Sequence, residues 1–245
     1  MPTPYQSIAE LVQDLENHPV EQGGHIYHPI PFPEFSHLKT SSNRDEVLAK
    51  GRCVEQALRL VLPGGLSGAK ILDVGANAGF YTFSLAQAGA TVTAFEPHPR
   101  YAPLGGFLAA EKKLDVRWHG TAFEQSAVRG QRFDAALMFS VFQWMADGGN
   151  RLEQATADLR AISEISGCLV FELGYNRGKS CVKTNKLNHY AELIRFLETA
   201  TVYKHFQLLA KTKLWRGASR YLVLCSHRPE FKDSAFRRMQ RALKF

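Results

Sequence analysis

The chain has 245 residues, of which 45% are hydrophobic, and a formal net charge of +7 at neutral pH. It is long enough for one domain with a full core, and no segment is long and apolar enough to span a bilayer. Residues 1–22 carry four acidic residues and no apolar run of signal-peptide length, and the four cysteines show no paired metal spacing, so we expect a cytoplasmic protein with no bound metal. The positive charge favours an anionic partner without identifying it.

The first part of the chain is expected to form two helices and an irregular arm. Apolar residues at helical spacing predict a helix over 8–17 and another over 43–62, which Pro63-Gly64-Gly65 ends. Between them, 25–36 is dense in proline, aromatic and histidine residues and predicts irregular backbone.

From residue 70 onward the pattern alternates between strands and helices. Strands are expected over 70–75, 91–96, 115–119, 134–140 and 168–173, and helices over 79–88, 103–112, 150–162 and 187–197. Two further strands, 202–211 and 220–227, flank Gly217 and predict a closing hairpin. The expected fold is therefore α/β, with a seven-stranded, mostly parallel sheet, an antiparallel C-terminal hairpin and helices on both faces.

A glycine-rich turn follows the first strand of this sheet. In Asp73-Val-Gly75-Ala-Asn77-Ala-Gly79, the glycines allow close approach of a ligand, and the next helix presents free N–H groups. Glu96 ends the second strand about twenty residues later, where a carboxylate can accept hydrogen bonds from both ribose hydroxyls of a nucleoside. The two features predict a nucleoside-containing ligand.

The stretch 71–86 resembles the first motif of class I S-adenosylmethionine-dependent methyltransferases, which have a Rossmann-like fold, and Ala94-Phe-Glu-Pro97 resembles their second motif. Asn77 stands where many members carry glycine, and asparagine tolerates left-handed backbone angles. The resemblance implies S-adenosylmethionine as cofactor and S-adenosylhomocysteine as product. It implies cofactor contacts from Asp73, Gly75, Ala76, Asn77, Gly79, Tyr81, Glu96 and Pro97.

Two later segments extend the resemblance. Thr121-Ala122-Phe123 follows the third strand, where the family packs the adenine ring, and Phe139-Ser140 stands where the family places residues beside the sulfonium. Core packing is the competing interpretation for Phe139 and Phe142. Gln143 and Trp144 are expected to face the acceptor, because α/β sheets bind ligands at the carboxyl ends of their strands.

The acceptor is harder to predict than the cofactor. No Asn/Asp-Pro-Pro-Tyr/Phe motif follows the fourth strand and no Pro-Cys nucleophile is present, so base methylation is disfavoured. Segments 169–174 and 219–227 resemble the methyltransferase part of bacterial kinase-methyltransferases that cap O-antigens, which implies an oxygen of a small-molecule, sugar or glycan-linked acceptor. RNA is the main alternative because of the charge; an NAD(P)-dependent oxidoreductase and a non-catalytic cofactor-binding protein are weaker ones.

Basic residues and candidate bases lie outside the resembling motifs. Most of the lysines and arginines at 39–52 and 177–186 are expected to face water, with Arg44 and Lys179 preferred as acceptor ligands together with Tyr175. Glu172 and His189 are the candidate catalytic residues, and His28 and His37 are further histidines that could accept a proton.

Three regions follow from this pattern. Residues 1–66 are expected to form a helical arm that contributes to the acceptor site, 67–228 the cofactor-binding core, and 229–245 a basic tail. Residues 236–245 could form a short amphipathic helix in peripheral contact with a membrane, or a solvated terminus.

Overall fold

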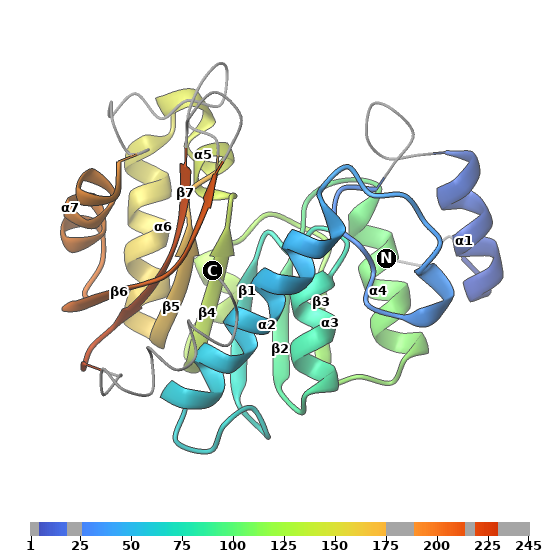
Figure 1. Ribbon diagram of the computed structural model, residues 1–245, viewed down its shortest axis with the longest axis horizontal. Coiled ribbons are helices and arrows are strands. Elements are labelled where there is room, and N and C mark those ends of the chain that lie inside the picture. Colours follow the sequence, from blue (N-terminus) through green and yellow to red (C-terminus); the bar gives the residue numbers. More distant parts are fainter. Residues whose placement is uncertain (1–4, 19–25, 175–188, 214–218, 230–245) are drawn as a thin grey trace.

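Seven strands form a single sheet in the order β3-β2-β1-β4-β5-β7-β6 (Figure 1). The strands are β1 (Lys70–Val74), β2 (Thr91–Phe95), β3 (Val116–His119), β4 (Phe133–Phe139), β5 (Ser166–Glu172), β6 (His205–Lys213) and β7 (Ser219–Ser226). The first five run parallel, and β7 pairs antiparallel with both β5 and β6. This confirms the predicted fold class. The computed structural model describes residues 5–18, 26–174, 189–213 and 219–229.

Helices cover both faces of the sheet (Figure 1). They are α1 (Ile8–Asn17), α2 (Arg44–Val61), α3 (Phe80–Gln87), α4 (Tyr101–Glu111), α5 (Phe142–Met145), α6 (Leu152–Ile165) and α7 (Tyr190–Ala200). Helices α2 and α3 pack on one face, and α5, α6 and α7 pack on the other. The short α5 was not predicted, because one helical turn is too short to show a helical period.

The parallel strands are apolar on both faces, as expected for strands covered by helices on both sides. In β1, Ile71 points toward α2 and α3 and Leu72 toward α6, and both side chains are fully buried. The alternation places Asp73 on the α2 and α3 face, where its carboxylate is also buried. The core thus fixes the register that delivers Asp73 to the end of β1.

The N-terminal arm packs against α3 and α4 (Figure 1). Phe32, Phe35 and Leu11 join Phe83 and Leu104 in a third apolar cluster. Helix α2 then begins at the Asn43 cap, whose side chain accepts a hydrogen bond from the Glu46 N–H (3.1 Å). Within the described ranges, no helix has the length and apolar character needed to cross a membrane.

Candidate cofactor and acceptor site

The turn after β1 brings backbone N–H groups to the carboxyl edge of the sheet. Gly75, Asn77 and Gly79 have φ angles of 81°, 54° and 82°, so all three lie in the left-handed region. A Cβ on Gly75 would lie 2.1 Å from the Val141 side chain, which leaves room only for glycine there. Asn77 takes up the left-handed conformation predicted for it.

Two buried carboxylates flank this turn. Glu96 accepts hydrogen bonds from the N–H groups of Asn77 (2.6 Å) and His98 (2.8 Å), and Asp73 accepts one from the Thr82 hydroxyl (2.6 Å). The pKa of Asp73 is raised to about 7, mainly by burial. The Thr82 hydrogen bond lowers this pKa, and the nearby Glu96 carboxylate contributes to raising it. Burial likewise raises the pKa of Glu96, although the two backbone hydrogen bonds oppose it.

Aromatic rings continue the site along β2 and β3. The Phe95 ring stacks on His119 with centroids 4.4 Å apart and meets the Phe123 ring edge-on at 5.3 Å. Phe123 is buried, whereas Thr121 and Ala122 beside it are exposed. The exposed backbone and the buried ring together make an edge against which a base can lie.

The polar atoms around this turn suit a nucleoside that carries an amino-acid tail. Asn77 Oδ1 and His119 Nε2 are buried and have no hydrogen-bond partner among the described residues, which a bound ligand would remedy. The Glu96 carboxylate uses two acceptor positions for backbone and retains others for hydroxyl donors. The residues present therefore fit S-adenosylmethionine.

The ends of β4 and β5 form a second polar cluster beside the turn. Ser140, at a φ of 56°, donates its hydroxyl to Glu172 Oε1 (2.7 Å), and Lys50 of α2 donates to the same oxygen (3.1 Å). The Lys50 ammonium also lies 4.8 Å from the centroid of the Phe139 ring. Burial alone would raise the pKa of Glu172, but Lys50, Arg220 and Ser140 together lower it, so Glu172 is an anion.

A cavity of about 460 Å³ opens beside Glu172, and we call it the edge cavity. Its walls come from the arm (Tyr27, His28 and Ser42), the first half of α2, and the ends of β5, β6 and β7. Its lining includes three basic residues, Lys50, Lys211 and Arg220, and three acidic ones, Asp45, Glu46 and Glu172. Its size is that of a small-molecule site.

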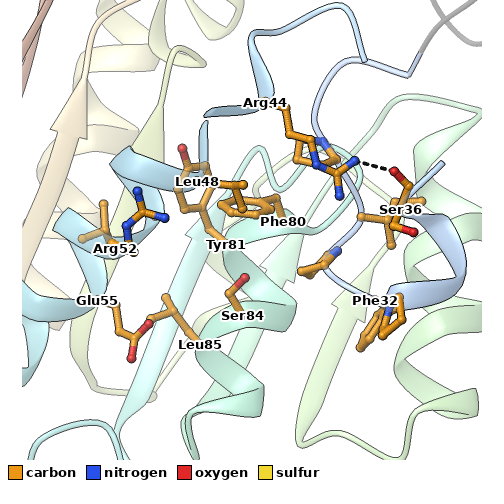
Figure 2. A pocket seen from close by; sticks show the side chains of 16 residues that line it. Phe32, Ser36, Arg44, Leu48, Arg52, Glu55, Phe80, Tyr81, Ser84 and Leu85 are labelled. Atoms are coloured by element: carbon orange, nitrogen blue, oxygen red, sulfur yellow. Dashed lines mark hydrogen bonds between the residues drawn. The ribbon is translucent and has the colours of Figure 1, made fainter. Parts of the chain in front are cut away.

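A second cavity, of about 390 Å³, lies between the arm, α2 and α3, and we call it the arm cavity (Figure 2). Phe32, Leu48, Phe80 and Leu85 make its lining largely apolar. Figure 2 shows Arg44 at its rim, where the guanidinium donates to the Ser36 carbonyl (2.8 Å). No strand residue lines this cavity, and neither Glu172 nor Lys50 is among its lining residues.

Other predicted residues have assignable positions. The Gln143 side-chain amide is buried and makes two hydrogen bonds to the backbone. It donates to the Ser140 carbonyl (2.6 Å) and accepts from the Gly174 N–H (3.2 Å). Trp144 is 68% exposed, and Phe142 is fully buried, as core packing predicts. The exposed side chain of His189 precedes α7.

The remaining candidates divide between exposed residues and residues that are not described. Exposed His37 pairs with Glu16, away from the cluster. Pro97 is exposed, and Gly79 is the N-cap residue of α3. Tyr175 and Lys179 lie outside the described residues, as does the predicted basic tail.

Sequence reasoning missed Arg220 and did not single out Lys50. Both lie at ordinary positions of a strand and a helix, and only tertiary structure brings them to Glu172. Tyr81 was predicted as a cofactor contact. Its ring contacts His28 and Phe139, and its buried hydroxyl has no partner among the described residues, so its cofactor contact stays a prediction.

The strand order, the glycine turn after β1 and the acid after β2 are together typical of class I S-adenosylmethionine-dependent methyltransferases. A family model described as "Methyltransferase domain" matches residues 72–171 of this chain.

Curated relatives match the same part of the chain. The ubiquinone biosynthesis O-methyltransferase of Cereibacter sphaeroides is 31% identical over 88 residues, which are 36% of this chain and 36% of that protein. The enzyme of that name from Methylocella silvestris is 34% identical over 85 residues, 35% of this chain and 33% of that protein. The matched part thus spans about a third of the length of these relatives.

Solved structures share the fold at low identity. The bifunctional kinase-methyltransferase WbdD aligns with a TM-score of 0.69 at 15% identity, over 88% of this chain and 46% of that chain. The N-terminal domain of EvdMO1, solved with S-adenosylhomocysteine bound, aligns with a TM-score of 0.62 at 14% identity, over 93% of this chain and 100% of that chain.

Proposed function

We propose that this chain transfers a methyl group from S-adenosylmethionine to an oxygen of a small-molecule, sugar or glycan-linked acceptor. The observation that carries the proposal is the juxtaposition of the glycine turn, Asp73 and Glu96 with the edge cavity at one edge of the sheet. The curated relatives named as O-methyltransferases support an oxygen acceptor.

The cofactor supplies an electrophilic methyl group on a positively charged sulfur. Methyl transfer is an in-line displacement, so the protein's part is to hold the two reactants in line. Glu96 would bind the ribose hydroxyls, the N–H groups of the turn the amino-acid carboxylate, and Asp73 the cationic end of that tail.

Glu172 has a narrower role in this proposal than as general base. Its pKa is lowered, and one of its oxygens already accepts from Lys50 and Ser140, so it is a weak proton acceptor. We assign it to holding Lys50 and Ser140 in place at the boundary between cofactor and acceptor. His189 stays a candidate base, and Tyr175 and Lys179, which lie outside the described residues, stay candidate acceptor contacts.

The alternatives have less support. An antiparallel β7 between β5 and β6 departs from the all-parallel 3-2-1-4-5-6 order of dinucleotide dehydrogenases. RNA binding is supported only by the +7 charge, whereas the edge cavity has the size of a small-molecule site. An RNA substrate predicts affinity that falls steeply with salt, which filter binding would measure.

Calorimetry with S-adenosylmethionine tests the proposal. We expect binding to the wild-type chain and a loss of about tenfold to a hundredfold in Glu96→Ala, because two hydrogen bonds to a charged carboxylate disappear. Glu198→Ala, at an exposed position on α7, serves as the matched control and should bind as the wild type does. A folded wild-type chain without measurable affinity would refute the proposal.

A further inference from the structure

We propose that the edge cavity recognises an acidic group of the acceptor, a phosphate or a carboxylate, and that Arg220 is the residue that binds it. This inference rests on the proposed function, because it concerns the acceptor of the same reaction. It commits the acceptor to an anionic class, which the net charge of the chain alone could not do.

The position of Arg220 places a guanidinium inside the cavity. Arg220 lies near the start of β7, and its register partner on β6 is Thr212, so antiparallel pairing brings it to the carboxyl edge of the parallel strands. Glu172 of β5 pairs with Leu222, two residues further along β7. Arg220 therefore lies beside Glu172 at the wall of the edge cavity.

The Nε atom of Arg220 is buried and has no hydrogen-bond partner among the described residues. Leaving a buried charged donor unsatisfied is costly, and an arginine can only donate. The ligand that satisfies it must therefore present an acceptor, and a phosphate or carboxylate matches the guanidinium best.

The other charged groups of the cavity do not neutralise Arg220. Glu172 is engaged by Lys50, and although Arg220 helps to lower the pKa of Glu172, no ion pair joins them in the described structure. Asp45 and Glu46, in the first turn of α2, are exposed at the rim. The inner part of the cavity thus carries one uncompensated positive charge.

Two more neighbours keep the cavity suited to an anion. Burial, reinforced by Lys50 and Arg220, lowers the pKa of His28 to about 3, so this histidine is neutral at physiological pH. Lys211, exposed at the mouth, lies 5.6 Å from the centroid of the Tyr221 ring and adds a second cation on the entry side. A neutral acceptor would offer no anionic group to either Lys211 or Arg220.

Calorimetry on the chain saturated with S-adenosylhomocysteine tests the inference. The probes are glucose 1-phosphate, glucuronate and uncharged glucose, which have similar size and differ in the acidic group. We expect at least one acid to bind more tightly than glucose, and the stronger of the two identifies phosphate or carboxylate. Arg220→Met should weaken that acid by about tenfold to a hundredfold, and Arg220→Lys by less, because a charge remains.

Controls separate this inference from folding and from the proposed function. Arg129→Met removes an exposed arginine on the loop before β4 and should bind the acid as the wild type does. The affinity of each variant for S-adenosylhomocysteine reports whether it is folded. The inference is overturned if neither acid binds the wild-type chain better than glucose, or if a folded Arg220→Met binds the acid unchanged. Failure of S-adenosylhomocysteine to bind the wild-type chain would instead refute the proposed function.

Discussion

The cofactor half and the acceptor half of the sheet edge are assembled from the chain in different ways. The cofactor half uses the loops after β1 and β2, and its main polar contact, Asn77 N–H to Glu96, joins residues 19 positions apart. The acceptor half joins Lys50 to Glu172 across 122 positions and adds Arg220 from β7. A site built from residues close together in the chain leaves a motif in the sequence, and a site built from distant residues does not.

The two halves also differ in charge. Asp73 and Glu96 give the cofactor half two buried carboxylates with raised pKa values, which suits a ligand with a positive sulfur and an ammonium group. The acceptor half instead contains three cations, Lys50, Lys211 and Arg220, beside the acidic residues of its lining. The boundary falls at Ser140 and Glu172, where the Glu172 carboxylate accepts hydrogen bonds from the Ser140 hydroxyl and the Lys50 ammonium.

The largest effect on stability is expected at the Lys50–Glu172 ion pair of the acceptor half. Lys50→Met would leave the 3%-exposed Glu172 side chain without its cation, and breaking a buried pair in this way costs about 3–5 kcal/mol of unfolding free energy. Urea denaturation measures the loss. Arg59→Met is the matched control on the same helix: it removes an exposed pair with Glu55 and should cost no more than about 1 kcal/mol.

A double variant shows whether the charge of Lys50 or its aliphatic stem accounts for the lost stability. In Lys50→Met/Glu172→Gln the unpaired charge is gone, so part of the lost stability should return. Equal stability of the single and double variants would mean that the Lys50 stem, and not its charge, holds α2 on the sheet.

Much of the fold could be predicted because the local signals agree with the tertiary structure. The strand 70–75 and the helix 8–17 were predicted nearly residue for residue, since the pattern of apolar residues marks both. In the cofactor half, the left-handed turn and Glu96 were predicted from glycine spacing and strand ends. The cofactor contacts of these residues stay predictions.

The acceptor half could not be predicted to the same depth. Arg44 and Lys50 lie six residues apart on α2, and the sequence favoured Arg44, but Arg44 lines the arm cavity and Lys50 the edge cavity. Helix rotation relative to the sheet decides which side each faces, and periodicity does not specify it for charged residues. The Gln143 side chain is likewise buried and bonds to the Ser140 carbonyl, while its neighbour Trp144 is exposed.

A smaller effect is expected in the cofactor half. The pKa of Asp73 is raised from 3.8 to about 7, so the folded chain binds more protons than the unfolded chain between these values, and its ionised form opposes folding above them. Stability contributed by this group therefore falls as pH rises from about 4 to 7. Asp73→Asn should raise the unfolding free energy at pH 8 by about 1–3 kcal/mol. One pKa unit corresponds to ~1.4 kcal/mol, and the cost of removing the new amide from water offsets part of the gain.

Urea denaturation of Asp73→Asn and wild type from pH 5 to pH 8 measures this difference. The gap should widen with pH, whereas Glu198→Gln, at an exposed position, should run parallel to the wild type throughout. A constant gap would show that Asp73 does not titrate in this range. The stabilised variant should also bind S-adenosylmethionine more weakly, because it lacks the charge that the cationic tail contacts.

The smallest effect is expected at Arg44, and it separates the two cavities that flank α2. Arg44→Ala removes a half-exposed side chain whose described contact is the Ser36 carbonyl, so the unfolding free energy should change by no more than about 0.5 kcal/mol. Affinity for the acidic probe should change by less than about twofold, because Arg44 lines the arm cavity, which Arg220 does not reach. Calorimetry beside Arg220→Met makes the comparison direct. A loss at Arg44 as large as that at Arg220 would move the acceptor from the edge cavity to the arm cavity, and α2 would then present its other side to the substrate.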